Sequence, residues 1–198
     1  MKLISYKISN SENHQIGVIQ DNIVYNLNIC FGNISLIEIF QIKNYQDRIA
    51  SSISNNECIK HDLDKITPLP PIPNPNSFRD AYAFRQHVET SRKNRGMNMI
   101  DEFDQFPVFY FSNHNTMYGD QEIIKVMPDH FEKLDFELEF AIVIGIGGKN
   151  ILSKDAEKHI AGFCILNDLS CRKLQMEEMK LNLGPAKGKD FANVIGPY

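Results

Sequence analysis

The segment at residues 134–144, LDFELEFAIVI, constrains the fold of this chain most. It alternates apolar and acidic residues over its first six positions and then becomes almost wholly apolar. In a β-strand, successive side chains point to opposite faces, so every second residue lies on the same face. The pattern therefore predicts a strand that carries Asp135, Glu137 and Glu139 on one face.

Glu137 and Glu139 are expected roughly 7 Å apart on that face, because a strand rises about 3.3 Å per residue. Two buried carboxylates this close cannot both stay ionised without a compensating cation. Oxygen ligands suit a hard ion such as Mg²⁺ or Ca²⁺ better than zinc. The alternative is a strand whose acidic face is turned to water. The segment by itself leaves both interpretations open.

The size and charge of the chain exclude several classes of protein. With 198 residues, 42% of them hydrophobic, the chain is long enough to bury a core. A net charge of −4 argues against a nucleic-acid partner. We expect no signal peptide, no membrane partner and a cytoplasmic location, because the longest apolar run, residues 140–148, cannot span a bilayer. The cysteines have no metal-ligand spacing and are expected to be free thiols: Cys30, Cys58, Cys164 and Cys171.

A proline-rich connector at residues 67–75 divides the chain into two predicted parts. Residues 1–66 are expected to form a small β-rich domain with strands, one helix and a polar loop: strands 2–8, 14–20 and 22–29, and helix 35–42. Residues 67–198 are expected to form a second, larger domain: helices 79–96, 153–160 and 171–180, and strands 107–113, 122–128, 134–144 and 161–168. The predicted fold class is α+β.

Asp80 and His87 both lie in the predicted helix 79–96. Seven residues apart, they would share a helical face and be separated by about 10 Å of axial rise. That distance is too long for both to bind one ion, but it suits a metal ligand and a base that acts on a molecule held by the metal. The alternative is a solvated helix with an incidental histidine.

Two further segments carry polar residues next to apolar strands. Asp168 ends the predicted strand 161–168 and is a candidate metal ligand, although an aspartate there can also cap the following helix. Residues 183–191, LGPAKGKDF, indicate in their plainest interpretation a turn after a helix, with exposed lysines.

Four segments, in this order along the chain, resemble the motifs of the fumarylacetoacetate hydrolase family: RDAYAFRQH, LDFELEFAIVIG, NDLSCRKLQ and LGPAKGKDF. The resemblance implies a β-rich, barrel-like roll with a small N-terminal domain, usually assembled as a homodimer. Members of the family typically continue beyond the position of Tyr198. The resemblance therefore predicts that the C-terminal part of the roll is missing from this chain.

The resemblance also implies roles for individual residues. The metal ligands implied are Asp80, Glu137, Glu139 and Asp168. His87 is implied as the general base and Tyr82 as a substrate contact, while the groups that bind and stabilise the reacting substrate are Arg172, Gln175 and Lys189. Four carboxylates around one divalent cation leave a charge of −2, which Arg172 and Lys189 would balance if they close on the site.

The activity implied is metal-dependent hydrolysis of a C–C bond in a 3-oxo or 2,4-dioxo acid, such as fumarylacetoacetate or an acylpyruvate, in the breakdown of aromatic compounds, including aromatic amino acids. The cofactor implied is one Mg²⁺ or Ca²⁺ ion. A first alternative keeps the site but changes the reaction to decarboxylation, isomerisation or hydration of a small keto acid. A second alternative is an inactive, truncated fragment that only binds a metal or a partner.

Overall fold

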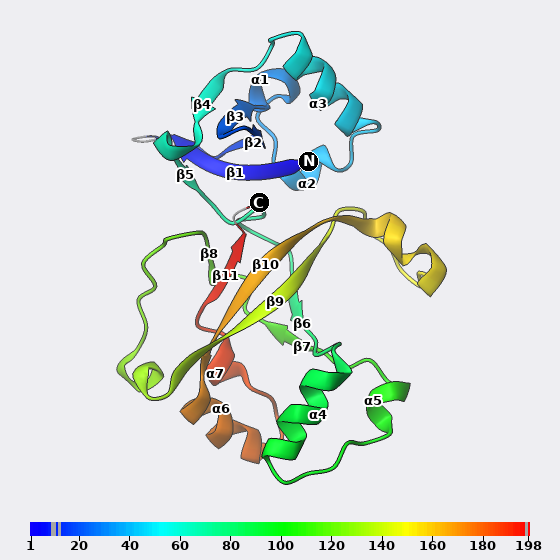
Figure 1. The fold of residues 1–198 in the computed structure, drawn as a ribbon, viewed down its shortest axis with the longest axis vertical. Coiled ribbons are helices and arrows are strands. Elements are labelled where there is room, and N and C mark those ends of the chain that lie inside the picture. Colours follow the sequence, from blue (N-terminus) through cyan, green and yellow to red (C-terminus); the bar gives the residue numbers. More distant parts are fainter. Residues whose placement is uncertain (9–10, 12, 197) are drawn as a thin grey trace.

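The computed structural model describes residues 1–8, 11, 13–196 and 198 of the chain. They form one five-stranded, one four-stranded and one two-stranded sheet, together with short helices. Figure 1 shows the five-stranded sheet with its helices at one end of the molecule and the other two sheets below it. The predicted α+β class is confirmed.

The five-stranded sheet has the order β4-β3-β2-β1-β5 and is antiparallel throughout. Its strands are β1 (Lys2–Ile8), β2 (Gln15–Gln20), β3 (Ile23–Asn26), β4 (Lys60–Asp62) and β5 (Ile66–Pro68). Ile4, Tyr6 and Val24 are fully buried on one side of it. Because β5 pairs with β1, the start of the predicted connector belongs to this sheet.

Three helices pack near this sheet: α1 (Asn28–Phe31), α2 (Leu36–Ile39) and α3 (Tyr45–Ser54). The predicted helix 35–42 is confirmed in shortened form as α2, which begins with a capping box between Ser35 and Glu38. The polar loop predicted after it is wrong, since α3 forms there. Ile49 anchors α3 in the core, where its side chain is fully buried.

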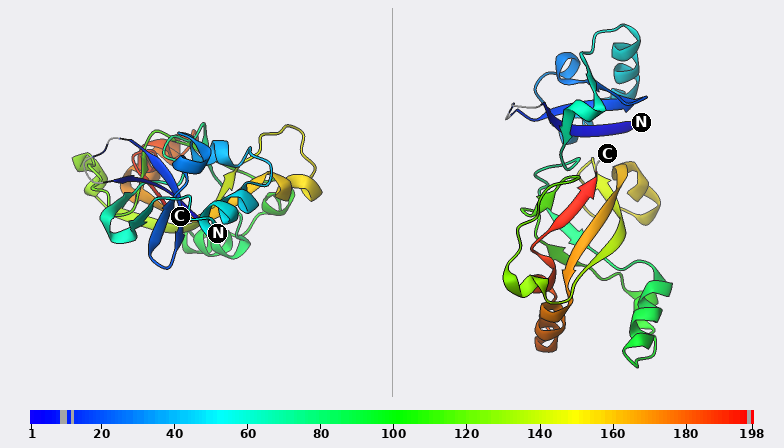
Figure 2. Two further views of the ribbon diagram at one scale, coloured as in Figure 1. Left: turned by 90° about the horizontal axis from the view of Figure 1, so that it is seen from above. Right: turned by 60° about the vertical axis from the view of Figure 1, so that its left-hand side comes forward.

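The four-stranded sheet carries the acidic strand and has the order β8-β11-β10-β9. Its strands are β8 (Met117–Tyr118), β9 (Leu134–Ile144), β10 (Ile160–Cys171) and β11 (Asn193–Gly196). The long strands β9 and β10 are antiparallel and twist together across the molecule, with β11 beside β10 (Figure 2). The strands predicted at 134–144 and 161–168 are thus confirmed, and the second is longer than predicted.

The remaining elements surround this sheet. They are β6 (Phe78–Asp80), α4 (Arg85–Asn94), α5 (Glu102–Gln105), β7 (Tyr110–Ser112), α6 (Arg172–Glu178), α7 (Ala186–Lys189), and 3-10 segments at Leu63–Lys65, Pro128–Phe131, Ser153–His159 and Met179–Leu181. The strands β6 and β7 form the two-stranded sheet. Helices α4 and α5 form an arm that projects away from the long strands (Figures 1 and 2).

Three predicted elements of the second part differ from the structure. The helix predicted at 79–96 begins only at Arg85, because Phe78–Asp80 pairs with β7 as strand β6. The strand predicted at 122–128 does not form. Ile123 in that stretch is 88% exposed, and an apolar segment without a neighbouring strand lacks the pairing that a strand needs. The helix predicted at 153–160 is a 3-10 segment.

The exposure of the side chains on β9 contradicts the alternative in which the acidic face of this strand is turned to water. Phe136, Leu138 and Phe140 are 63%, 75% and 59% exposed, whereas Glu137 and Glu139 are half-buried. The acidic face is therefore the one that the rest of the molecule covers. In the described part of the chain, no helix combines the length and the apolar character needed to cross a bilayer.

Candidate functional site

The pairing of β9 with β10 brings three acidic residues onto one face of the sheet. Asp168 lies directly opposite Glu137, and Leu166 lies opposite Glu139. Directly opposite residues of an antiparallel pair project to the same side. Asp168 is almost fully buried, as is Leu166 beside it. The register thus assembles Glu137, Glu139 and Asp168 from segments some thirty residues apart in the sequence.

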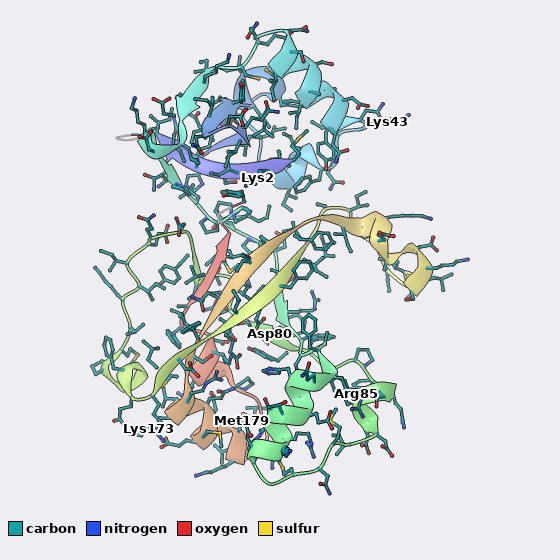
Figure 3. The ribbon with its side chains drawn as sticks, viewed as in Figure 1. Lys2, Lys43, Asp80, Arg85, Lys173 and Met179 are labelled. Carbon is teal, nitrogen blue, oxygen red and sulfur yellow. The ribbon has the colours of Figure 1, made fainter. Side chains whose placement is uncertain are left out.

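Asp80 reaches this acidic face from β6 (Figure 3). One carboxylate oxygen each of Asp80, Glu139 and Asp168 lie within 4.8 Å of one another. Tyr110, opposite Asp80 in the β6–β7 pair, donates a hydrogen bond from its hydroxyl to Asp80 Oδ2 at 2.7 Å. Asp80 therefore sits at the end of a short strand and is oriented by its cross-strand neighbour.

Two basic side chains, Lys189 and Arg172, bind carboxylates of this acidic face and partly neutralise their charge. The Lys189 ammonium, buried with its side chain only 4% exposed, donates to both Glu137 Oε2 and Asp168 Oδ2. Arg172 donates to Asp135 Oδ2 at 2.8 Å and to Glu137 Oε1 at 2.9 Å. Glu137 is thus held by both cations, whereas Asp80, Glu139 and Asp168 form the closest group of carboxylates.

The local sequence explains how Lys189 comes so close to the sheet. Helix α7 packs against α6, and a side chain on Gly188 would lie 2.7 Å from the backbone nitrogen of Gln175. Only glycine permits this approach. Glu178 of α6 accepts hydrogen bonds from the backbone nitrogens of Lys187 and Gly188 at 2.8 and 2.7 Å. The predicted exposed turn at 183–191 is therefore wrong for Lys189, although Lys187 is exposed.

Burial and mutual repulsion perturb the titration of this cluster. Burial, reinforced by the neighbouring Asp80 and Asp168, raises the pKa of Glu139 to about 8. Burial also raises the pKa of Asp168 to about 7, although the Lys189 cation opposes this. For Glu137, burial pushes the pKa upward, but Lys189 and Arg172 more than offset it and hold the pKa below its usual value. Full ionisation of the cluster is therefore disfavoured by repulsion between its carboxylates, and a further cation would relieve that repulsion.

The acidic group fits a hard divalent cation. Asp168 Oδ1 is buried and has no hydrogen-bond partner among the described residues. A buried carboxylate oxygen without a donor is costly, and a bound cation would satisfy it. The ligands would be oxygens of Asp80, Glu139 and Asp168, with Glu137 beside them, which is the donor set of Mg²⁺, Mn²⁺ or Ca²⁺.

Among the described residues, His87 and Tyr82 make no hydrogen bond or ion pair with the carboxylates of the cluster. His87 lies exposed on α4, and Tyr82 lies exposed in the 81–84 segment, stacked on Phe103 at 6.3 Å between ring centroids. The predicted common helical face of Asp80 and His87 is wrong, because Asp80 is in a strand and the chain turns before α4 begins. Gln175 does approach the site, since its Oε1 accepts a hydrogen bond from Arg172 Nη1 at 3.0 Å.

Two residues near the cluster were not predicted from the sequence. Tyr110 lies in an apolar segment, so its phenol was indistinguishable from a core aromatic. Burial, with the charges of Asp168 and Asp80, raises its pKa above the usual value and keeps the hydroxyl a donor. Asn193 lies opposite Asp168 on β11, and its buried Oδ1 has no hydrogen-bond partner among the described residues. Neither position has a local sequence signal.

We expect Tyr110→Phe to weaken the binding of Mg²⁺ or Mn²⁺ by about 10- to 100-fold, because residues that orient a metal ligand typically contribute that much. The fold should be retained, since the ring remains. Isothermal titration calorimetry measures the change, and Tyr118→Phe on β8 is the matched control. Equal affinity in Tyr110→Phe and the wild type would show that the hydrogen bond to Asp80 does not support a metal ligand.

The affinity for a divalent cation should depend steeply on pH. A cation binds the ionised carboxylates, so protons compete with it wherever the pKa is high. Since the pKa is about 8 for Glu139 and about 7 for Asp168, affinity should fall by about a hundredfold between pH 9 and 6.5. Titrations in buffers of different ionisation enthalpy should show proton release at pH 7. Glu139→Gln should flatten this dependence, while Glu157→Gln should leave it unchanged.

The chain is similar to proteins of one known family. Residues 76–198 match the family described as fumarylacetoacetate (FAA) hydrolase C-terminal. A fumarylacetoacetase of Oryza sativa subsp. japonica is 47% identical over 70 residues, which cover 34% of this chain and 16% of that protein. An oxaloacetate tautomerase of Bacillus subtilis is 29% identical over 141 residues, covering 69% of this chain and 44% of that protein.

The fold is shared with solved structures. Maleylpyruvate hydrolase from Sphingobium sp. SYK-6, in complex with manganese(II) ion and pyruvate, superposes with a TM-score of 0.70 at 14% identity. The match covers 100% of this chain and 66% of that one. The chain thus spans less than two thirds of the length of these relatives. Because the family match extends over more than half of its residues, as the sequence motifs predicted, the chain belongs to the fumarylacetoacetate hydrolase family.

Proposed function

We propose that this chain carries the catalytic centre of a hydrolase that depends on a divalent cation and cleaves a C–C bond in a 3-oxo or 2,4-dioxo acid, such as a product of aromatic-compound breakdown. The observation that carries the proposal is the close group of Asp80, Glu139 and Asp168 oxygens, with the buried Lys189 cation beside it. Acids alone would repel an anionic keto acid. The cations of Lys189 and Arg172 reduce that repulsion.

A divalent cation held by these carboxylates would supply Lewis-acid polarisation of the substrate's carbonyl oxygens. The chain's own groups have distinct tasks in the proposal. Arg172 binds the substrate carboxylate, and Lys189 stabilises the negative charge of the departing enolate. The Oε1 atom of Gln175 is engaged by Arg172, which leaves its amide nitrogen to donate to the substrate. His87 is the proposed base that removes a proton from water, and Tyr82 is a proposed substrate contact.

A second candidate is keto–enol tautomerisation of a small keto acid. It is favoured by the Bacillus subtilis oxaloacetate tautomerase, which aligns with 69% of this chain. The same cations would stabilise an enolate in this reaction, but no C–C bond would break. A cytoplasmic location, a homodimeric assembly and the choice among Mg²⁺, Mn²⁺ and Ca²⁺ stay predictions.

One assay separates the two reactions. The purified protein is given Mg²⁺, Mn²⁺ or Ca²⁺ and then an acylpyruvate or oxaloacetate, with products followed by NMR. Cleavage of the acylpyruvate into two acids supports the hydrolase. Accelerated keto–enol exchange of oxaloacetate without cleavage supports the tautomerase. If neither reaction occurs at a saturating concentration of the cation, both proposals are contradicted. Asp168→Asn, which removes one candidate ligand, should abolish whichever activity is found.

A further inference from the structure

A pair of cysteines lies far from the carboxylate cluster, in the part of the chain that contains the five-stranded sheet. The sulfur atoms of Cys30 and Cys58 are 3.6 Å apart, although the residues are 28 positions apart in the sequence. Both thiols are free, as the sequence analysis predicted. Cys30 is on α1 and is partly exposed, whereas Cys58 is buried just before β4.

The backbone on each side of the pair is fixed by hydrogen bonds. The nitrogen of Asn26 donates to the carbonyl of Ile59 at 2.8 Å, which joins the two segments beside the thiols. The nitrogen of Cys30 donates to the carbonyl of Leu27 at 3.1 Å and holds the first turn of α1. Cys58 belongs to the hydrophobic core, and Cys30 packs against that core. The fold itself therefore holds the two sulfurs next to each other.

We propose that Cys30 and Cys58 form a dithiol site that small-molecule disulfides, such as oxidised glutathione, convert into an intramolecular disulfide. A bond requires the sulfurs to approach from 3.6 Å to about 2.05 Å. Rotation of the two side chains and a small shift of the four-residue helix α1 provide this movement. The neighbouring thiol is then a far better partner than any second small molecule, because it is already in contact.

The reaction proceeds by two exchanges. The Cys30 thiolate attacks one sulfur of the small disulfide, forms a mixed disulfide and releases one thiolate. The Cys58 thiol loses its proton to solvent and attacks the Cys30 sulfur, which releases the second small thiol. The protein dithiol loses two electrons and two protons, and the small disulfide is reduced to two thiols.

The environments of the two sulfurs determine the order of attack. Burial, together with the adjacent Cys30, raises the pKa of the Cys58 thiol to about 12. Cys58 is therefore a poor first nucleophile and is also hidden from a solution reagent. Cys30 is the accessible thiol, so the mixed disulfide forms there and Cys58 resolves it.

The bridge would close a loop that contains α2 and α3. This loop includes Gln41, whose side-chain nitrogen donates to the carbonyl of Gly145 beyond the end of β9. Oxidation would restrict the segment that touches the long β9–β10 pair. A crosslink around a loop of this length stabilises mainly by restricting the unfolded chain. The oxidised protein should therefore melt at a higher temperature than the reduced protein.

The test uses the intact wild-type chain under native conditions. Treated with oxidised glutathione, it should lose the mass of two hydrogen atoms, and peptide mapping should find Cys30 linked to Cys58. The Tm should rise by about 5 °C or more and return on reduction. Cys30→Ser should remove both the crosslink and the rise in Tm, while Cys164→Ser, at another buried thiol, should retain both.

Three results would overturn the proposal. One is a glutathione adduct that persists on Cys30 without resolution by Cys58. Another is a crosslink that involves Cys164 or Cys171 in place of the proposed pair. The third is a native wild-type chain that stays unmodified at a glutathione disulfide concentration that does oxidise the unfolded chain. Because mass mapping is done on the wild type, the conclusion holds even if a cysteine variant folds poorly.

Discussion

Replacement of Lys189 by methionine is expected to reduce the free energy of unfolding at pH 8 by about 3–5 kcal/mol, the usual cost of removing one partner from a buried ion pair. The Lys189 ammonium donates to both Glu137 and Asp168, and its side chain is almost completely buried. Methionine has a similar length and no charge. It would leave two carboxylates on one buried face with Arg172 as their nearest cation.

The loss of unfolding free energy in Lys189→Met should be larger at high pH than at low pH. Without Lys189, the folded-state pKa of Asp168 rises further above its unfolded value, and the pKa of Glu137 rises from the lowered value that Lys189 and Arg172 maintain. Groups with raised acid pKa values destabilise the fold where they must ionise, and the penalty disappears as they become protonated. Asp168 already has a pKa of about 7 with Lys189 in place. The difference between variant and wild type should be largest above pH 8 and shrink as the pH falls below 7.

Urea denaturation at pH 8 and at pH 5 measures this difference. Lys187→Met is the matched control, because Lys187 lies on the same helix but is exposed, and it should change stability by less than about 0.5 kcal/mol. Added Mg²⁺ should restore part of the loss in Lys189→Met by supplying the missing positive charge. A deficit that is the same at both pH values would mean that Lys189 acts by packing and not by charge.

The acidic strand could be predicted from the sequence because its information is local. The alternation in 134–144 determines which side chains share a face, and the structure has β9 over the same residues. Which face is covered could not be read from the alternation. It follows from the position of Lys189, which reaches Glu137 from 52 positions further along the chain. Charge balance in the sequence suggested such a cation, but only the packing of α7 on α6 supplies it.

Non-local pairing explains the errors around Asp80. The polar and apolar residues after Phe78 fit a helical period, yet hydrogen bonding to β7 determines their conformation. The same pairing brings Tyr110 to Asp80. Helix α3 was missed for the opposite reason. Its serines and its flanking asparagines have weak helix propensity, and burial of Ile49 in the core compensates for that weakness.

His87→Asn is expected to lower kcat for the proposed keto-acid reaction by about 10²–10⁴, the usual contribution of a positioned general base. Asparagine keeps the shape and polarity of the side chain but cannot accept the proton. Affinity for Mg²⁺ or Mn²⁺ should stay within about twofold of the wild type, because His87 lies on α4 and the three clustered carboxylates come from β6, β9 and β10.

Because His87 is exposed on α4, the prediction that it acts as the base can fail in two distinct ways. Arg85, at the start of α4, forms ion pairs with Glu89 of the same helix at 3.5 Å and with Asp104 of α5 at 3.2 Å, within the arm made by the two helices (Figure 3). If the arm keeps His87 exposed during turnover, His87→Asn will be as active as its matched control, His114→Asn, and the base must be sought elsewhere. If metal affinity falls together with kcat, His87 is a ligand. Only loss of kcat with unchanged metal binding agrees with the role of a base.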